Sequence, residues 1–234
     1  EPAGPLIDDE VGLGGEPDSE FLHVIADAAK RAGALLIFDE IVTGFRYRKG
    51  SVQHCFGIVP DITCLGKALA SGMPLSAILG SQSLFLPAFH KTHFHPTFRG
   101  EVYSLAAAKA AIQIYRSEPV ARKIWKHGEK LRRGIHALCR ELGVDGFCSG
   151  PPFRMAFIFR EADAYNRRLK KTLLMQELVR NRVMTVGGML LPSSAHDDAT
   201  MAQTLTAFRC ALTVAAEADR NNDLHRHIEL VVGG

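Results

Sequence analysis

The chain has 234 residues, of which 47% are hydrophobic and 23% are charged, and its formal net charge is +3. A chain of this length buries enough apolar surface for one large domain or two small ones. The modest charge and the absence of a compact Lys/Arg run argue against binding to nucleic acid or to an acidic membrane surface. No apolar run reaches the roughly 18 residues that a membrane-spanning helix needs, and no signal-peptide pattern is present.

The cysteines and histidines favour neither a disulfide framework nor a metal site. The five cysteines are scattered and include no CxxC pair (Cys55, Cys64, Cys139, Cys148 and Cys210). This usage is typical of reduced thiols, so we expect a cytoplasmic protein. His90, His93 and His95 have no standard zinc spacing and no neighbouring cysteine or carboxylate, so we expect no metal there.

The first part of the chain predicts a helix followed by three short strands. The helix begins after Asp18 and ends at Gly33, with apolar residues at helical spacing on one face. The continuous apolar run 34–38 predicts a strand buried on both faces, as in a parallel sheet covered by helices. The runs 62–65 and 76–80 predict two further strands, and this alternation of strand and connection is typical of α/β proteins.

The remainder of the chain is expected to be mostly helical. Residues 104–142 have a helical pattern that Pro119 interrupts, because proline starts a new helix more readily than it continues an old one. The glycine-rich stretch 143–152 is interpreted as a linker. A strand is expected at 153–159 and helices at 165–181 and 198–217, the last one capped by Asp197 or Asp198. We therefore expect a smaller α+β domain over residues 120–234.

Asp39 and Lys67 are the first candidates for chemistry, since each follows a predicted buried strand. In open α/β sheets, ligands bind at the carboxyl edge of the strands, where these two side chains would face one crevice. One interpretation is a structural salt bridge between them. The other is a lysine whose amine attacks a carbonyl group, and the small residues around Lys67 favour it because they leave space for a cofactor.

Four sequence blocks, taken in order, carry a resemblance to a known family. They are "LLIFDEIVTGFR" (35–46), "PDITCLGKALASGMPLSAILG" (60–80), "HPTFRGEVYSLAAAKAAI" (95–112) and "LLPSSAHDDATMAQTL" (190–205). Together they resemble the class III aminotransferases, which use pyridoxal phosphate. The form "DEIVTGFR" is most similar to the glutamate-1-semialdehyde aminomutase branch, in which a residue other than glutamine stands at the position of Val42.

The resemblance implies a fold and a set of site residues. The fold is that of fold type I enzymes: a three-layer sandwich with a mainly parallel sheet, of which residues 1–119 would be the C-terminal portion, followed by the small domain. Lys67 matches the lysine that forms the internal aldimine, and Asp39 matches the aspartate that bonds the pyridine nitrogen. Ile41 matches the apolar residue on one ring face. Thr97 matches the phosphate-binding threonine, which the family supplies from the neighbouring subunit, so the resemblance implies a homodimer with a shared site.

Two features depart from the family pattern. Arg99 stands where glycine is usual, which places a cation beside the expected phosphate loop; we expect it to face solvent or a surface partner. In addition, family members carry a substantial segment before the "EP" that opens this chain, including the loop that cradles the phosphate. We therefore expect this sequence to be a fragment or one part of a longer protein.

Three functions follow from these observations. The first is an aminotransferase that moves an amino group between a small amino donor and an oxo acceptor. The second is an aminomutase that transfers the nitrogen within one molecule. The third is a non-catalytic chain that keeps the fold for dimerisation or scaffolding; the expected fragment favours this last function, and the presence of Lys67, Asp39 and Thr97 argues against it.

Overall fold

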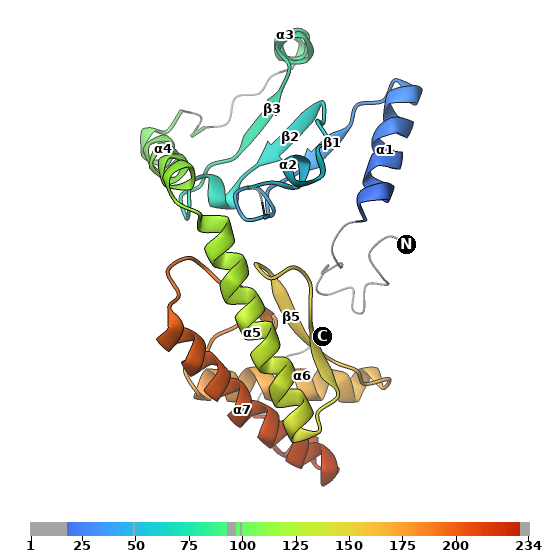
Figure 1. Ribbon diagram of the computed structural model, residues 1–234, viewed down its shortest axis with the longest axis vertical. Coiled ribbons are helices and arrows are strands. Elements are labelled where there is room, and N and C mark those ends of the chain that lie inside the picture. Colours follow the sequence, from blue (N-terminus) through green and yellow to red (C-terminus); the bar gives the residue numbers. More distant parts are fainter. Residues whose placement is uncertain (1–17, 49, 93–96, 99, 230–234) are drawn as a thin grey trace. The chain divides into compact units, whose positions relative to one another are not determined.

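The computed structural model describes residues 18–229 except for 49, 93–96 and 99, and these residues divide into two compact units (Figure 1). The first unit extends to Arg122 and the second begins at Lys123. Each unit combines helices with a three-stranded sheet. Within the described residues, no helix has both the length and the apolar character needed to cross a bilayer.

The first unit is built on the sheet order β1-β2-β3. Its elements are α1 (Ser19–Ala32), β1 (Ile37–Asp39), α2 (Val52–Phe56), β2 (Ile62–Leu65), the 3-10 turn η1 (Lys67–Leu69), β3 (Ala77–Gly80), α3 (Gln82–Lys91) and α4 (Val102–Ser117). Strands β1 and β2 are parallel, and Ile37 pairs with Ile62. Strand β3 is antiparallel to β2. The short connection explains this direction, because a parallel neighbour needs a crossover of a dozen or more residues.

The predicted first helix and the strand after 61 are confirmed, whereas the predicted burial of the first strand is wrong. Helix α1 begins after the cap residue Asp18 and ends at Gly33, whose φ of 64° only glycine adopts without strain. None of the residues of α1 is buried. Strand β1 is shorter than expected, and the side chain of Ile37 is 55% exposed. Burial on both faces requires covering layers, and among the described strands β1 pairs with β2 alone.

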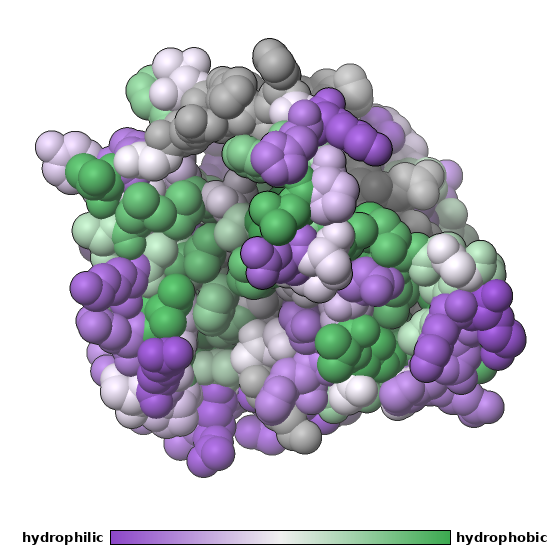
Figure 2. All heavy atoms as spheres, turned by 90° about the horizontal axis from the view of Figure 1, so that it is seen from above, coloured by the Kyte–Doolittle hydropathy of each residue, from purple (hydrophilic) through white to green (hydrophobic). Residues whose placement is uncertain are grey.

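Apolar side chains remain on the surface of the first unit. Figure 2 shows hydrophobic residues in several patches on the face that it presents. The exposed large apolar residues of this unit come from helices, strands and connections alike, and they include Phe21, Val24, Leu35, Ile78, Leu86, Phe89 and Leu105. The apolar stripe that predicted α1 is therefore a surface feature in this structure.

The second unit has one continuous core formed by three helices and a sheet. Its elements are α5 (Val120–Leu142, which begins before the unit boundary), β4 (Gly146–Ser149), β5 (Met155–Phe159), α6 (Ala164–Arg180), β6 (Met189–Leu190), α7 (Asp198–Arg220) and the 3-10 turn η2 (Leu224–Arg226). Side chains from all three helices and from the sheet meet in this core, among them Ile135, Met155, Leu173 and Leu212, which are at most marginally exposed.

Several predictions for the second half of the chain are confirmed. The helical stretch is interrupted at Glu118 and Pro119, which lie between α4 and α5. Helices α6 and α7 occupy the expected ranges within a few residues. Asp197 is the cap of α7, and its carboxylate accepts a hydrogen bond from the Thr200 N–H at 2.8 Å.

The interpretation of residues 143–152 as a linker is wrong, because this stretch contains strand β4. Strand β4 is antiparallel to β5, with Gly146 opposite Phe159. A Cβ atom on Gly146 would lie 2.4 Å from the ring of Phe157, so a glycine is needed where the aromatic side chain crosses the strand. The glycines that suggested a linker therefore permit close packing within the sheet.

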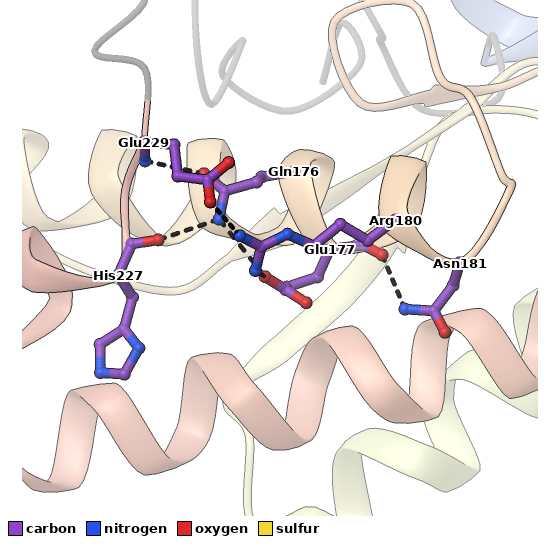
Figure 3. Close-up of polar contacts among 6 residues, drawn as sticks. All are labelled: Gln176, Glu177, Arg180, Asn181, His227 and Glu229. Atoms are coloured by element: carbon purple, nitrogen blue, oxygen red, sulfur yellow. Dashed lines mark hydrogen bonds and ion pairs between the residues drawn. The ribbon is translucent and has the colours of Figure 1, made fainter.

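A polar cluster attaches the end of the described chain to α6 (Figure 3). The Gln176 side chain donates to the carbonyl of His227 at 2.9 Å and accepts from the N–H of Glu229 at 2.9 Å. The Arg180 guanidinium forms ion pairs with both Glu177 and Glu229. Residues 227–229 are thus held against α6 by backbone and side-chain contacts together.

Candidate active site

Asp39 and Lys67 lie at the same edge of the first sheet. Asp39 is the last residue of β1 and pairs with Cys64 of the neighbouring parallel strand β2. The ladder continues one step further, where the N–H of Glu40 donates to the carbonyl of Cys64 at 3.0 Å. Lys67 follows two residues after the end of β2. Both side chains are exposed, and they share the carboxyl edge at which α/β sheets bind ligands.

The Asp39 carboxylate is oriented by its own backbone turn. Its Oδ1 accepts a hydrogen bond from the N–H of Ile41 at 2.9 Å. No ion pair joins Asp39 to Lys67 in the described part of the chain, so the structural salt bridge left open by the sequence is not formed in this structure.

Lys67 has an unusual backbone conformation. Its φ is +43°, in the left-handed region that non-glycine residues rarely adopt. It opens the 3-10 turn η1, in which the N–H of Leu69 donates to the carbonyl of Gly66 at 2.9 Å and that of Ser71 donates to the carbonyl of Lys67 at 3.1 Å. Strained conformations of this kind persist only where the surroundings enforce them, and they are concentrated at functional sites.

Ile41 is brought close to Lys67 through Gly66. A Cβ atom on Gly66 would lie 3.4 Å from Cγ2 of Ile41, so the Ile41 side chain rests against the backbone immediately before Lys67. The sequence predicted Ile41 as a neighbour of the site, and the structure places it between the two strand ends. Asp39, Ile41 and Lys67 therefore form one group, which we call the strand-end cluster.

Thr97 is the predicted site residue that the structure does not bring into this cluster. It lies in an exposed turn before α4, and among the described residues no hydrogen bond joins it to Asp39, Ile41 or Lys67. Arg99, His93 and His95 lie outside the described residues, as does the beginning of the chain.

Glu40 is an organising residue of the site that the sequence reasoning missed. Its side chain is only 1% exposed, although it directly follows the exposed Asp39. The carboxylate accepts hydrogen bonds from the N–H groups of Val52 and Gln53 at 3.1 and 2.9 Å, and from the hydroxyl of Thr43 at 2.5 Å. A buried charge needs partners of this kind. The sequence did contain a hint of this role. Two acidic residues follow the apolar run, and the proposed ligand site uses only one of them, Asp39, so the second could have been assigned a structural role.

The loop between Glu40 and α2 also places a second cation near the cluster. The Arg46 side chain donates to the carbonyl of Val42 at 3.2 Å. Burial lowers the pKa of Arg46, while its electrostatic interaction with Tyr115 acts in the opposite direction. Tyr115, a residue of α4, is a further contact of this loop that the sequence did not identify.

These features define what the strand-end cluster can do chemically. Lys67 offers a primary amine at an exposed position, and primary amines condense with carbonyl groups. Asp39 offers a carboxylate that favours a positive charge on a neighbouring group. Ile41 offers an apolar side chain against the backbone that precedes Lys67. The cluster is thus suited to a planar carbonyl compound that contains a basic nitrogen.

The curated proteins similar to this chain include several aminomutases. The glutamate-1-semialdehyde 2,1-aminomutase of Aquifex aeolicus is 28% identical over 224 residues, which are 90% of this chain and 53% of that protein. The enzyme of the same name from Thermomicrobium roseum is 30% identical over 214 residues, 86% of this chain and 49% of that protein. The chain thus spans about half the length of these curated relatives, and the expected resemblance to their branch is confirmed.

The solved structures similar to this chain include transaminases and a protein described with pyridoxal phosphate. FumI from Sphingopyxis sp. MTA144, described in its PLP internal aldimine form, matches with a TM-score of 0.81 and 25% identity, over 89% of this chain and 50% of that one. An omega-transaminase from Sphaerobacter thermophilus matches with a TM-score of 0.74 and 22% identity, over 85% of this chain and 48% of that one. These matches confirm the predicted α/β fold class.

The family model "Aminotransferase class-III" matches residues 7–144, which is more than half of the sequence. The matched region contains the strand-end cluster and both strands that carry it. The ordered motifs, the parallel strand ends and this match agree, and the chain belongs to the class-III aminotransferase family.

Proposed function

We propose that this chain is part of a pyridoxal-phosphate-dependent aminotransferase, which moves an amino group between a small amino donor and a keto or aldehyde acceptor. The observation that carries the proposal is the position of Asp39 and Lys67 at the adjacent carboxyl ends of β1 and β2. A carboxylate and an amine on neighbouring strand ends match the two reactive ends of this cofactor, its ring nitrogen and its aldehyde.

The residues around Lys67 fit a flat cofactor. Gly66 and Ala68 flank the lysine with no bulky side chain, and both are buried. A Cβ atom at position 66 would be in van der Waals contact with Ile41, so Gly66 lies directly against the Ile41 side chain. The left-handed backbone of Lys67 is a local strain that a structural surface lysine does not require.

Each residue of the site has a defined task in this proposal. When bound, pyridoxal phosphate supplies an aldehyde that condenses with an amine, releasing water, and a ring that withdraws electrons from the substrate carbon. Lys67 provides the amine Nζ and, when that nitrogen is free, moves a proton at the substrate Cα. Asp39 holds the proton on the pyridine nitrogen, and Ile41 supports one face of the ring.

Thr97 completes the proposed site by donating a hydrogen bond to the cofactor phosphate. The family resemblance implies that this threonine comes from the neighbouring subunit. We therefore assign this task to Thr97 of a second copy of the chain, in a cytoplasmic homodimer with a shared site. In the same proposal, residues 1–119 belong to the cofactor-binding domain and residues 120–234 form the small domain.

An aminomutase is the second candidate function. The names of the curated relatives favour it, since both are glutamate-1-semialdehyde 2,1-aminomutases. The tasks of Lys67 and Asp39 are the same in both reactions. The difference is whether the amino group returns to the same substrate molecule or passes to another.

The test is whether Lys67 becomes covalently linked to the cofactor. The full-length protein is incubated with pyridoxal phosphate, reduced with borohydride and digested, and the modified peptide is identified by mass spectrometry. We expect a yellow protein that loses its colour on reduction, with the label on Lys67, and a Lys67→Ala variant that remains colourless. A label on Lys109 or Lys91 in place of Lys67, or no label at all, would refute the proposal. Product analysis with a single amino substrate then separates aminomutase from aminotransferase.

A further inference from the structure

Tyr115 of α4 contacts both segments that carry the strand-end cluster. Its hydroxyl donates a hydrogen bond of 2.7 Å to the carbonyl of Ala68, the residue directly after Lys67. Its ring stacks on that of Phe45 with a centroid separation of 4.8 Å and an interplanar angle of 20°. Phe45 belongs to the loop that follows Asp39. One side chain therefore contacts the lysine segment and the aspartate loop at the same time.

The same helix supports these contacts with apolar packing. Ala108 of α4 lies in a small buried cluster with Leu69 and Ala70, which follow Lys67. Ile112 of α4 and Phe45 pack against this cluster at its margin. Helix α4 thus provides an apolar surface for the turn that begins at Lys67, and Tyr115 adds a directional contact, a hydrogen bond to the backbone.

Both segments held by Tyr115 have a strained backbone. Phe45 has a φ of 64° and Lys67 has a φ of 43°, and both are non-glycine residues in the left-handed region. Such a conformation is unfavourable for a residue with a side chain and persists only when neighbouring contacts impose it. Ala68 lies in the 3-10 turn that begins at Lys67. A hydrogen bond to its carbonyl oxygen therefore restrains the backbone on the C-terminal side of the lysine.

We propose that Tyr115 is a positioning residue that holds Lys67 in the conformation from which its amine reaches the cofactor aldehyde. The inference rests on the proposed function and adds to it a residue from outside the strand ends. Tyr115 acts through the backbone of Ala68 and through Phe45. Its loss therefore weakens the covalent attachment of the cofactor and leaves its non-covalent binding largely intact.

The experiment compares two cofactor forms that differ only at the reactive carbon. Pyridoxal phosphate can bond to Lys67, whereas pyridoxamine phosphate carries an amine in place of the aldehyde and cannot. The dissociation constants of both are measured for the full-length wild-type protein and for Tyr115→Phe, which keeps the ring and removes the hydroxyl. Tyr165→Phe is the matched control, because Tyr165 is 66% exposed and belongs to the second unit.

We expect Tyr115→Phe to raise the dissociation constant of pyridoxal phosphate by about two- to tenfold, the range that loss of one hydrogen bond produces. The constant for pyridoxamine phosphate should change by less than about twofold, as for a substitution without local consequence. Hydrogen exchange in the cofactor-free protein provides a second readout. The amides of Leu69 and Ser71, which close the turn after Lys67, should exchange faster in Tyr115→Phe and not in Tyr165→Phe.

Four outcomes overturn the inference. Equal weakening of both cofactor forms would assign Tyr115 a general packing role. Unchanged binding of pyridoxal phosphate, or unchanged exchange at Leu69 and Ser71, would show that the hydroxyl does not restrain Lys67. If the wild-type protein forms no covalent link at Lys67, the proposed function itself fails, and the positioning role of Tyr115 fails with it. If the wild-type protein is labelled at Lys67, the proposed function holds, and a negative result for Tyr115→Phe then contradicts the positioning role alone.

Discussion

The carboxylate of Glu40 accepts a hydrogen bond of 2.9 Å from the backbone N–H of Gln53, which lies thirteen residues further along the chain. The N–H of Val52 and the hydroxyl of Thr43 bond to the same carboxylate. One buried side chain thus closes the loop after Asp39 and caps the first turn of α2. The neighbouring residues Asp39 and Glu40 therefore differ in role. The Asp39 side chain is exposed at the edge of the sheet, whereas the Glu40 side chain is buried in the loop.

Glu40→Gln should destabilise the protein, because one carboxylate oxygen that accepts a backbone N–H is replaced by an amide nitrogen, which cannot accept it. We expect a loss of about 1–3 kcal/mol in the free energy of unfolding, measured by far-UV circular dichroism in urea. Glu20→Gln is the matched control in the same unit, since Glu20 is exposed in the first turn of α1 and should lose less than about 1 kcal/mol. Equal losses in the two variants would contradict the structural task of Glu40.

Asp39→Asn tests the carboxylate of the strand-end cluster without disturbing its backbone turn. The asparagine oxygen can still accept the hydrogen bond from the Ile41 N–H, but the negative charge is lost. We expect amino transfer by the full-length protein to slow by about 10²-fold or more, as for the removal of other groups that stabilise developing charge. Single-turnover absorbance changes with an amino donor measure this rate. Asp27→Asn, an exposed change on α1, should be as fast as the wild type; a similarly fast Asp39→Asn would remove Asp39 from the mechanism.

Gly128→Ala should destabilise the second unit, because α5 approaches the chain at Pro152 too closely for a side chain. A Cβ atom at position 128 would lie 2.0 Å from the carbonyl oxygen of Pro152. We expect a cost of about 1–3 kcal/mol, since the backbone must move to relieve the overlap. Trp125, the only tryptophan, lies on the same helix beside Phe153 and reports unfolding by its fluorescence. Arg133→Ala, an exposed change on α5, should stay within about 0.5 kcal/mol; a comparable result for Gly128→Ala would refute the close contact.

The thiols of the second unit should differ sharply in reactivity. Burial raises the pKa of Cys148 to about 12 and that of Cys139 to about 11, whereas Cys210 is exposed on α7. A raised pKa keeps a thiol protonated and unreactive below that value, so both buried thiols stay neutral between pH 7 and pH 9. Iodoacetamide should therefore label Cys210 first, and Cys139 and Cys148 only after unfolding, as mass spectrometry of the native protein can show. Cys210→Ser should remove the fast labelling, and rapid native labelling of Cys148 would contradict its burial.

Much of the local structure could be predicted from the sequence. Helices α1 and α7 have cap residues at their starts, Asp18 and Asp197, and these caps act within three residues of sequence. Strand β2 coincides with the short apolar run 62–65. Strand β4 was not predicted, because its glycine suggested a linker. Gly146 is instead needed because the ring of Phe157, a residue of the next strand, packs across it.

The sequence by itself identified the two residues that we propose to carry the chemistry, an amine at Lys67 and a carboxylate at Asp39. Each follows an apolar run and lies within one of the motifs that carry the family resemblance. Only the tertiary structure decided how they are held. The parallel pairing of β1 with β2 brings the two strand ends to one edge. The bond from Tyr115 to Ala68 joins positions 47 residues apart, and no local pattern encodes it. The physical reason is that caps and apolar runs act between near neighbours, whereas register, burial and backbone strain depend on contacts that exist only once distant segments have met.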